Sequence, residues 1–265
     1  MSIKLKISGE LAQTLTCQLD PEQAIYSNAN KFRWKTTNVS LETRFSSPSS
    51  SDAQDGDTKK GGFLQQALST ATEVGKRALG GQSLAFQWFR PSGGSGLVGL
   101  AGTLPGQLRA IELDGSLGWF AEREAFICAE EGVAFNIAFS KLGVGLRSGE
   151  GFILEHFTGQ GTLVVAGGGT LTEIDPSAYG GKVQVHAGAI VAFADTVSYG
   201  VEFIGGLNAQ TAMTVAFGGQ GFNLVKLEGS GPVLLQSTLH TNLEREEANT
   251  DEQRGILGGG IFDRR

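Results

Sequence analysis

Apolar and polar residues alternate along much of this chain. Residues 3–7 read IKLKI and residues 183–186 read VQVH. A period of two places one set of side chains on each face of a β-strand, as in a sheet with one buried face. Short stretches of this kind recur about every 8 to 12 residues, separated by GQG, GSG, GG and DG turns. The pattern predicts an all-β barrel or sandwich.

One stretch of this pattern occurs three times. Residues 148–167 (SGEGFILEHFTGQGTLVVAG) align with residues 218–237 (GGQGFNLVKLEGSGPVLLQS), and a third copy lies at 80–102 (GGQSLAFQWFRPSGGSGLVGLAG). The first alignment matches Gly151 with Gly221, Phe152 with Phe222, Leu154 with Leu224, Gly159 with Gly229, Gly161 with Gly231 and Leu163 with Val233. In the third copy, Leu84, Phe86 and Phe89 match Phe152, Leu154 and Phe157, and Gly96 matches Gly161 after a three-residue insertion.

A second motif recurs in step with the first. Its copies are AFICAEEGVAFNIAF (125–139), AIVAFADTVSYGVEF (189–203) and, more faintly, AIYSNANKFRW (24–34). In the faint copy, Phe32 and Trp34 take the places of Val133 and Phe135. Internal repetition indicates a repeated supersecondary unit. We therefore expect three tandem β units.

The expected units cover residues 1–101, 102–166 and 167–240. Units of this size bury little surface when they stand alone, so they are expected to pack on one another.

Two segments depart from the strand pattern. Residues 62–79 (GFLQQALSTATEVGKRAL) have apolar residues at helical spacing, which predicts an amphipathic helix inserted in the first unit. We expect it to dock on the β core or on a neighbouring subunit, with peripheral membrane contact as the alternative. The preceding loop, 46–62, is rich in Ser, Asp and Gly and is expected to be mobile. The charged, then Gly-rich tail, 241–265, is expected to be disordered, with a docking strip as the alternative.

Charge and composition limit the function classes. The chain has 21 Lys and Arg against 27 Asp and Glu, a formal net charge of −6, which disfavours a nucleic-acid phosphate binder. Its 40 glycines have no period of three and only six prolines accompany them, which excludes collagen. No apolar run resembles a signal peptide or a membrane span. Cys17 and Cys128 form no CxxC motif and are expected to be buried free thiols. We expect a soluble, cytoplasmic protein.

The sequence predicts no catalytic, cofactor-binding or metal-binding residues, and no cofactor. The three histidines, His156, His186 and His240, lack the spacing of metal motifs. Gly94, Gly96 and Gly99 fit GxGxxG, but the residues that follow cannot form the phosphate-facing helix, which favours a β-turn.

Paired carboxylates and one glycosylation pattern complete the candidate chemistry. Glu130 with Glu131 and Glu246 with Glu247 are interpreted as solvated turns, because catalysis needs sequestered, perturbed groups. The Asn38–Ser40 pattern has no consequence in a cytosolic chain.

Several of these stretches resemble a known family. GEGFILEHFTGQG, GAIVAFADTVSYGVEFIGGL, FGGQGFNLVKLEGSGPVLLQS and the interrupted GGFLQQAL…LGGQSLAFQWF are similar to the bacterial and mitochondrial biogenesis (altered inheritance of mitochondria) family, built from domains like the tryptophan RNA-binding attenuation protein (TRAP-like). The resemblance covers about residues 3–237. It implies three short double-stranded β-helix, jelly-roll-like units and a homotrimer whose nine units form a pseudo-ninefold ring. The family has no established enzymatic activity.

The resemblance has limits. Residues 208–215 read NAQTAMTV, with no basic residue, where the family commonly has a basic or Asn-containing stretch after GG(L/I), and the first unit diverges around LDPEQAIYSNAN. No RNA or tryptophan site transfers, because the ring analogy concerns fold and not residues. The expected function is a non-catalytic, ring-forming scaffold or interaction protein, with a protein partner unidentified. The alternative is a small-ligand or nucleic-acid binder that uses clefts between units.

Overall fold

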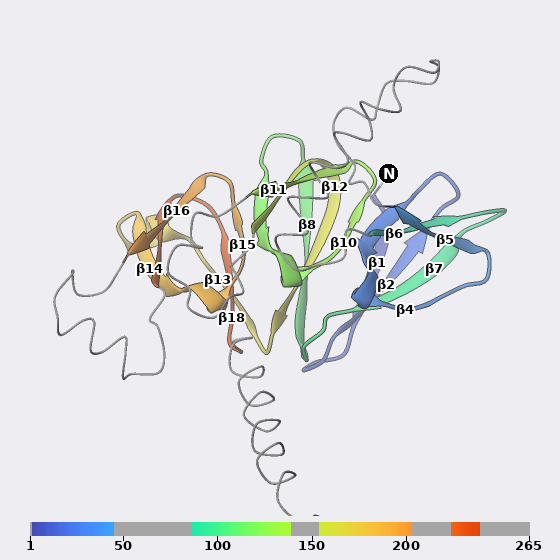
Figure 1. Ribbon diagram of the computed structural model, residues 1–265, viewed down its shortest axis with the longest axis horizontal. Coiled ribbons are helices and arrows are strands. Elements are labelled where there is room, and N and C mark those ends of the chain that lie inside the picture. The colour runs from blue at the N-terminus through green and yellow to red at the C-terminus, as the bar shows by residue number, and fades with distance from the viewer. Residues whose placement is uncertain (1, 45–85, 139–153, 203–223, 239–265) are drawn as a thin grey trace, which may run out of the picture.

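The computed structural model describes residues 2–44, 86–138, 154–202 and 224–238 (Figure 1). The expected loop 46–62, helix 62–79 and tail 241–265 lie outside these residues. Within them the fold is all-β, as the alternating pattern predicted, and short 3-10 turns join some of the strands.

The strands pair antiparallel throughout and form sheets of four, eleven and three strands in the described ranges. The 3-10 turns are η1 (Ala29–Lys31), η2 (Arg123–Ala125), η4 (Pro176–Tyr179) and η5 (Ala187–Ala189). The strands are β1 (Lys4–Ser8), β2 (Thr14–Leu19), β3 (Ile25–Asn28), β4 (Phe32–Lys35), β5 (Val39–Arg44), β6 (Phe86–Pro91), β7 (Gly96–Ala101), β8 (Gly106–Asp114), β9 (Trp119–Glu122), β10 (Phe126–Glu130), β11 (Val133–Ala138), β12 (Leu154–Gly168), β13 (Leu171–Ile174), β14 (Lys182–His186), β15 (Ile190–Ala194), β16 (Val197–Glu202), β17 (Leu224–Gly229) and β18 (Val233–Gln236).

The same set of strand pairings occurs three times. We call β2–β7 the first strand group, β8–β12 the second and β13–β18 the third. The pairing of β5 with β6 corresponds to β11 with β12 and to β16 with β17. Likewise β3 with β6 corresponds to β9 with β12 and to β14 with β17, and β4 with β7 corresponds to β10 with β12 and to β15 with β18.

The registers of these pairings agree residue by residue. A register shift follows Phe32, Phe126 and Ile190, at the same point of the three equivalent strands. Because these registers also place Gly96, Gly161 and Gly231 at equivalent points, they agree with the alignment of the glycines.

The alignment of the faint copy at 24–34 is wrong. In the structure Val39, not Phe32, takes the place of Val133, since Val39 begins the strand that pairs as β11 does. Phe32 instead follows the 3-10 turn, as Phe126 does in the second group. All three groups have polar residues just before this strand: TTN at 36–38, EEG at 130–132 and ADT at 194–196.

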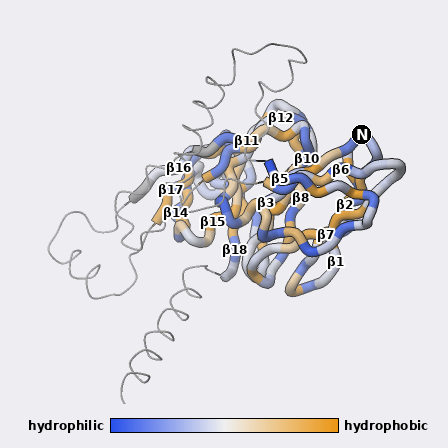
Figure 2. Tube along the Cα trace, turned by 45° about the vertical axis from the view of Figure 1, so that its right-hand side comes forward, coloured by the Kyte–Doolittle hydropathy of each residue, from blue (hydrophilic) through white to orange (hydrophobic). Residues whose placement is uncertain are grey.

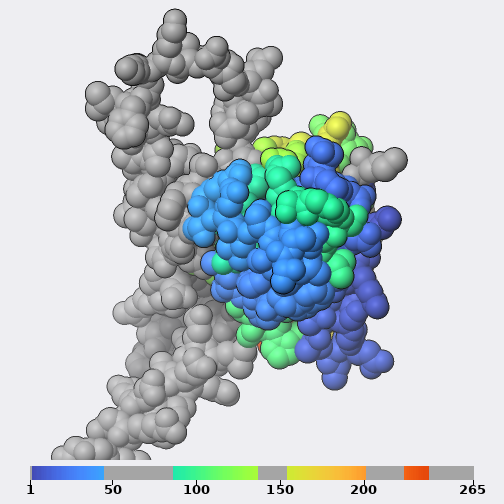
Figure 3. Space-filling model, turned by 90° about the vertical axis from the view of Figure 1, so that its right-hand side faces the viewer, coloured from blue at the N-terminus to red at the C-terminus, as the bar shows by residue number. Residues whose placement is uncertain are grey.

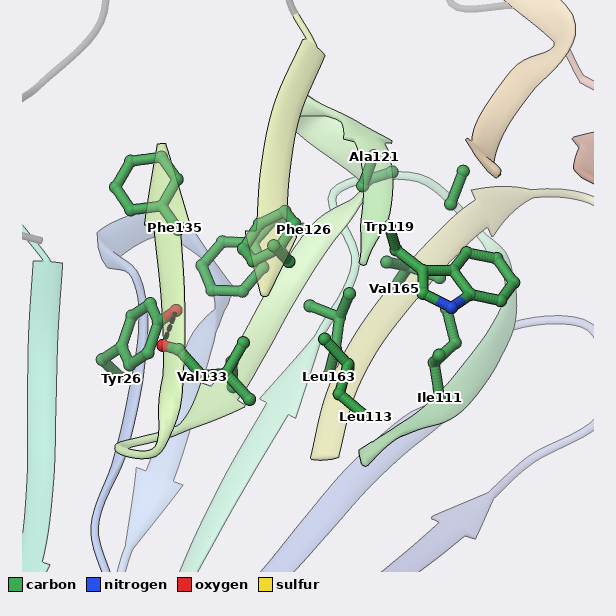
Figure 4. Close-up of a cluster of buried hydrophobic side chains, with 14 of the residues drawn as sticks. Tyr26, Ile111, Leu113, Trp119, Ala121, Phe126, Val133, Phe135, Leu163 and Val165 are labelled. Carbon is green, nitrogen blue, oxygen red and sulfur yellow. Dashed lines mark hydrogen bonds between the residues drawn. The ribbon is translucent and has the colours of Figure 1, made fainter. Parts of the chain in front are cut away.

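The hydrophobic core runs between the strand groups. Apolar positions lie on strands of all three groups (Figure 2). One cluster of buried side chains joins Tyr26 of the first group to Phe126 and Phe135 of the second (Figure 4). Phe86 of the first group belongs to the same cluster. Tyr26 also donates a 2.9 Å hydrogen bond to the carbonyl oxygen of Val133. The first two groups therefore share a core.

Candidate interaction edges and their junctions

Consecutive strand groups join through one kind of contact, which we call a junction. At the first junction β10 pairs with β3, and at the second β15 pairs with β9. The paired residues occupy equivalent positions: Cys128 with Ser27, Ala129 with Tyr26 and Glu130 with Ile25 at the first, and Ala192 with Ala121, Phe193 with Phe120 and Ala194 with Trp119 at the second. The second junction therefore repeats the register of the first.

A further backbone hydrogen bond also repeats. The amide of Glu131 donates to the carbonyl of Ala24 at 3.1 Å, and the amide of Asp195 donates to the carbonyl of Gly118 at 3.0 Å. Glu131 directly follows β10 and Asp195 directly follows β15. The repetition therefore extends beyond the paired strands themselves.

In the described part of the chain, one strand of the junction type lies unpaired with another group at each end of the molecule. β4 is equivalent to β10 and β15, but among the described residues it pairs with β7 alone. β14 is equivalent to β3 and β9, but there it pairs with β17 alone. The two strands lie at opposite ends of the molecule (Figure 1), and Figure 3 views the end formed by the first group. We call them the open edges.

Burial distinguishes the open edges from their internal equivalents. Every residue of β15, and every residue of β10 except Glu130, is buried. In β4, by contrast, Arg33 and Trp34 are exposed, and Trp34 retains 46% of its accessible surface. At the other edge Gln184 is exposed, and nearby Tyr179 is 63% exposed. The two open edges thus present aromatic surface to solvent.

Charge crosses the first junction near its outer end. Arg90 of β6 contacts the Glu131 carboxylate at 2.8 Å. On the inner side, Tyr26 stacks on Trp88 with ring centroids 5.2 Å apart.

The second junction contains His156, one of the histidines examined for metal binding. Its Nε2 lies 3.3 Å from Oδ2 of Asp195, which also accepts a 3.0 Å hydrogen bond from the amide of Gly118. The imidazole stacks on Phe120 with centroids 4.4 Å apart. His156 and Trp88 are equivalent in the registers of β12 and β6. His156 is therefore a junction residue.

A buried lysine also joins the first two groups. Lys31 of η1 is 0% exposed, and its Nζ donates to the Glu124 carbonyl at 2.9 Å and to Thr103 Oγ1 at 3.3 Å. The Glu124 carboxylate lies 3.6 Å away. Burial lowers the pKa of Lys31, and the negative charges of Glu124 and Glu122 oppose that effect. The sequence analysis did not identify Lys31, whose equivalents in the other groups are alanines.

Glu122 caps η2 beside this cluster. Its Oε2 accepts hydrogen bonds from the amides of Glu124 at 2.8 Å and Ala125 at 3.2 Å. Burial raises the pKa of Glu122 to about 7, and the negative charge of Glu124 adds to the rise. The carboxyl therefore titrates near neutral pH within the folded protein.

We expect Glu122→Gln to flatten the dependence of stability on pH. The folded pKa of Glu122 lies above its ordinary value of 4.5, so its contribution to stability is full below pH 4.5 and is lost as pH rises to about 7. Because Glu122 retains partial exposure, we expect the variant to be more stable than the wild type by about 2 kcal/mol at pH 8. At pH 4.5 the two should match. Urea unfolding at both pH values measures this, and equal differences at the two pH values would contradict it.

The two cysteines meet although they lie far apart in the sequence. Cys17 and Cys128 are both buried free thiols, as expected, and they share a hydrogen bond across the first junction. That hydrogen bond and burial raise the pKa of the Cys128 thiol. These thiols pack as core side chains.

The remaining sequence candidates have local structural roles. His186 caps η5, its Nδ1 accepting from the Gly188 amide at 3.0 Å. Gly96 and Gly99 lie in β7, and the next element along the chain is the strand β8. Asn38 donates to the carbonyl of Ser95 at 3.2 Å. His240, the pair Glu246 and Glu247, and residues 208–215 lie outside the described residues.

The expectation of a solvated turn is wrong for Glu130. Its carboxylate accepts hydrogen bonds from the amides of Ile3 at 2.6 Å and Thr162 at 3.1 Å. It thus satisfies backbone donors where the N-terminal segment and β12 pass β10. Glu131 is exposed and forms the ion pair with Arg90.

Neither a metal-binding cluster nor a membrane-spanning helix occurs among the described residues. They contain no cluster of three or more His, Cys, Asp or Glu side chains arranged to hold a metal ion. None of the helical segments in those ranges has the length and apolar character needed to cross a membrane.

Comparisons with known proteins agree with this architecture. Protein SPYM3_0169 from Streptococcus pyogenes, a structural genomics target, has a similar fold with a TM-score of 0.68 and 19% sequence identity, over 95% of this chain and 99% of that one. No match was found among curated proteins. The family model described as mitochondrial biogenesis AIM24 matches residues 5–238, which confirms the resemblance seen in the sequence. The chain therefore belongs to the mitochondrial biogenesis AIM24 family.

Proposed function

We propose that this protein is a non-catalytic scaffold or interaction protein that assembles head to tail through its two open edges. β4 of one copy would pair with β14 of the next, in the register of the two internal junctions. The strand groups would act as three jelly-roll-like units of one continuous wall. This proposal treats the chain as a building block whose surface, rather than a reaction centre, carries its function.

The observation that carries the proposal is the repeated register of the junctions. Two pairings with equivalent residues occur among the described residues, and there one strand of each type, β4 and β14, has no such pairing. Strand edges with free backbone donors and acceptors are natural sites for pairing with another chain. A heterologous contact of this kind closes into a ring when its rotation is a whole fraction of a turn. The family resemblance favours a homotrimer, with nine units in the ring.

The register specifies the pairs expected between copies. By equivalence with Cys128 and Ser27, Trp34 would lie opposite Val185. Lys35 would lie opposite Gln184, as Ala129 lies opposite Tyr26. A scaffold of this kind would hold its partner molecules at fixed positions relative to one another. A cytoplasmic location would suit its buried free thiols.

Mass measurement tests this proposal. We expect light scattering after size exclusion to give three times the 27.8 kDa mass of the chain. The mass should stay constant on moderate dilution, because a closed ring buries all its edges. A monodisperse monomer at concentrations of about 100 µM would overturn the proposal.

A further inference from the structure

We infer that Trp34 is the main apolar anchor between copies and that it packs on Ile174 of the neighbouring copy. The inference rests on the head-to-tail association proposed above and names the side chains that make it. The evidence is the set of side chains that occupy one equivalent position in each strand group.

The indole of Trp34 occupies space that a side chain fills in the other groups. Trp34 lies directly opposite Gly99 in the pairing of β4 with β7. A Cβ atom on Gly99 would overlap the indole ring. The absence of a side chain at Gly99 lets the indole lie flat on β7, with its outer part exposed.

The equivalent pairs distribute the same space differently. In the second group Cys128 lies opposite Val164, and in the third Ala192 lies opposite Leu234. At the two internal junctions this position thus holds a small side chain opposite a larger one. In the pair of Trp34 with Gly99, nearly all of the side-chain volume belongs to Trp34, on the open edge. The four internal residues are buried, and Trp34 is the exposed member of the series.

Each of these pairs also has a neighbour that comes from the preceding strand group. Cys17, Ile111 and Ile174 occupy equivalent points, since they lie opposite Val98, Leu163 and Val233. Cys17 shares a hydrogen bond with Cys128, and Ile111 belongs to the same buried cluster as Ala192 and Leu234. Ile174 is only partly buried and is the point on which Trp34 of another copy would pack.

Charge does not supply this contact. Thr37 stands where the internal junctions have Glu131 and Asp195, so the Arg90–Glu131 ion pair and the His156–Asp195 contact have no counterpart there. Lys226 stands at the position of His156, and it pairs with Glu228 of its own chain at 2.8 Å. Apolar burial by a large aromatic side chain is the typical anchor of an interface without paired charge.

The experiment compares self-association of the full chain and its variants by sedimentation equilibrium. Trp34→Ala should weaken association at least about thirtyfold, the effect of losing an aromatic hot spot. Leu11→Ala is the matched control, because Leu11 is 84% exposed in the turn between β1 and β2, and β1 lies at the opposite edge of its sheet from β4. It should associate as the wild type does. The wild-type association constant should change little with salt.

A compensating variant separates anchoring from folding. Trp34→Ala with Gly99→Leu reproduces the Ala192 and Leu234 pair, and it should fold and regain much of the association. Ile174→Ala removes the side chain of β13 on which Trp34 of the neighbouring copy is proposed to pack, and should weaken association about tenfold. Circular dichroism checks that each variant is folded.

The outcomes distinguish the two proposals. A wild-type chain that remains a monomer overturns the head-to-tail scaffold itself. A wild-type chain that associates, with Trp34→Ala and Ile174→Ala unchanged in affinity, overturns the anchor and leaves the scaffold standing. Should Trp34→Ala fail to fold, the compensating variant and Ile174→Ala decide the question.

Discussion

Phe126→Ala should lower the free energy of unfolding by about 3–5 kcal/mol, the usual cost of a large cavity in a packed core. Phe126 is fully buried and stacks on Phe157 with centroids 5.0 Å apart. Its ring centroid also lies 5.6 Å from that of Tyr26 and 6.4 Å from that of Phe86, both from the first strand group. The side chain therefore links two groups, and the loss should affect both.

Urea unfolding followed by tryptophan fluorescence and by circular dichroism measures this effect. Because the first two groups share a core, both probes should report one transition with the same midpoint in the wild type and in the variant. Leu11→Ala, at an exposed site, should change stability by less than about 0.5 kcal/mol. Separate transitions, with one group unaffected by the substitution, would show that the groups fold independently.

Gly159→Ala should destabilise the protein by about 3 kcal/mol. Gly159 has a φ angle of 100°, a conformation that residues with a Cβ rarely adopt. A Cβ atom there would also collide with the carbonyl oxygen of Gly132. The strain and the collision add, because the colliding atom belongs to backbone that cannot move without disturbing the pairing of β11 with β12.

Thermal unfolding of matched glycine variants measures this cost. Gly229 occupies the equivalent position, with a φ angle of 131°, so Gly229→Ala should have a similar cost. Gly200→Ala is the control, because no atom lies within 4 Å of its added Cβ. If Gly159→Ala and Gly200→Ala shift the midpoint equally, the recurring glycines are not required by backbone geometry.

The repeated glycines show why much of this fold could be predicted from the sequence. Gly159, Gly161, Gly229 and Gly231 all have positive φ angles, and the alternation around them is that of strands with one buried face. Both signals are local, so they survive in a single sequence. The all-β class and the correspondence of Phe86 with Leu154 followed from them.

The first strand group shows where sequence reasoning failed. Phe32 was aligned with Val133 because both are apolar and follow a similar stretch of sequence. In the structure Phe32 follows η1 as Phe126 follows η2, so the correct match is Phe32 with Phe126, and the sequence alignment was displaced along the chain. The corrected register is what identifies Trp34 as equivalent to Cys128.

The junctions could not be predicted because they depend on contacts between distant residues. Lys31 and Glu124 meet through the packing of two turns, and nothing in either local sequence marks a buried cation. His156 resembled an ordinary strand residue until β15 was placed beside β9. An alignment of the three groups in the correct register would have drawn attention to Lys31, which stands where the other groups have alanine.

Mixing two edge variants tests the head-to-tail account most directly. Trp34→Glu should block β4, and Val183→Glu should block β14, leaving each variant with one intact open edge. Each variant alone should be a monomer of 27.8 kDa, and an equimolar mixture should form a dimer of twice that mass in light scattering. Dimers formed by either variant alone, or a mixture that remains monomeric while the wild type associates, would contradict the account.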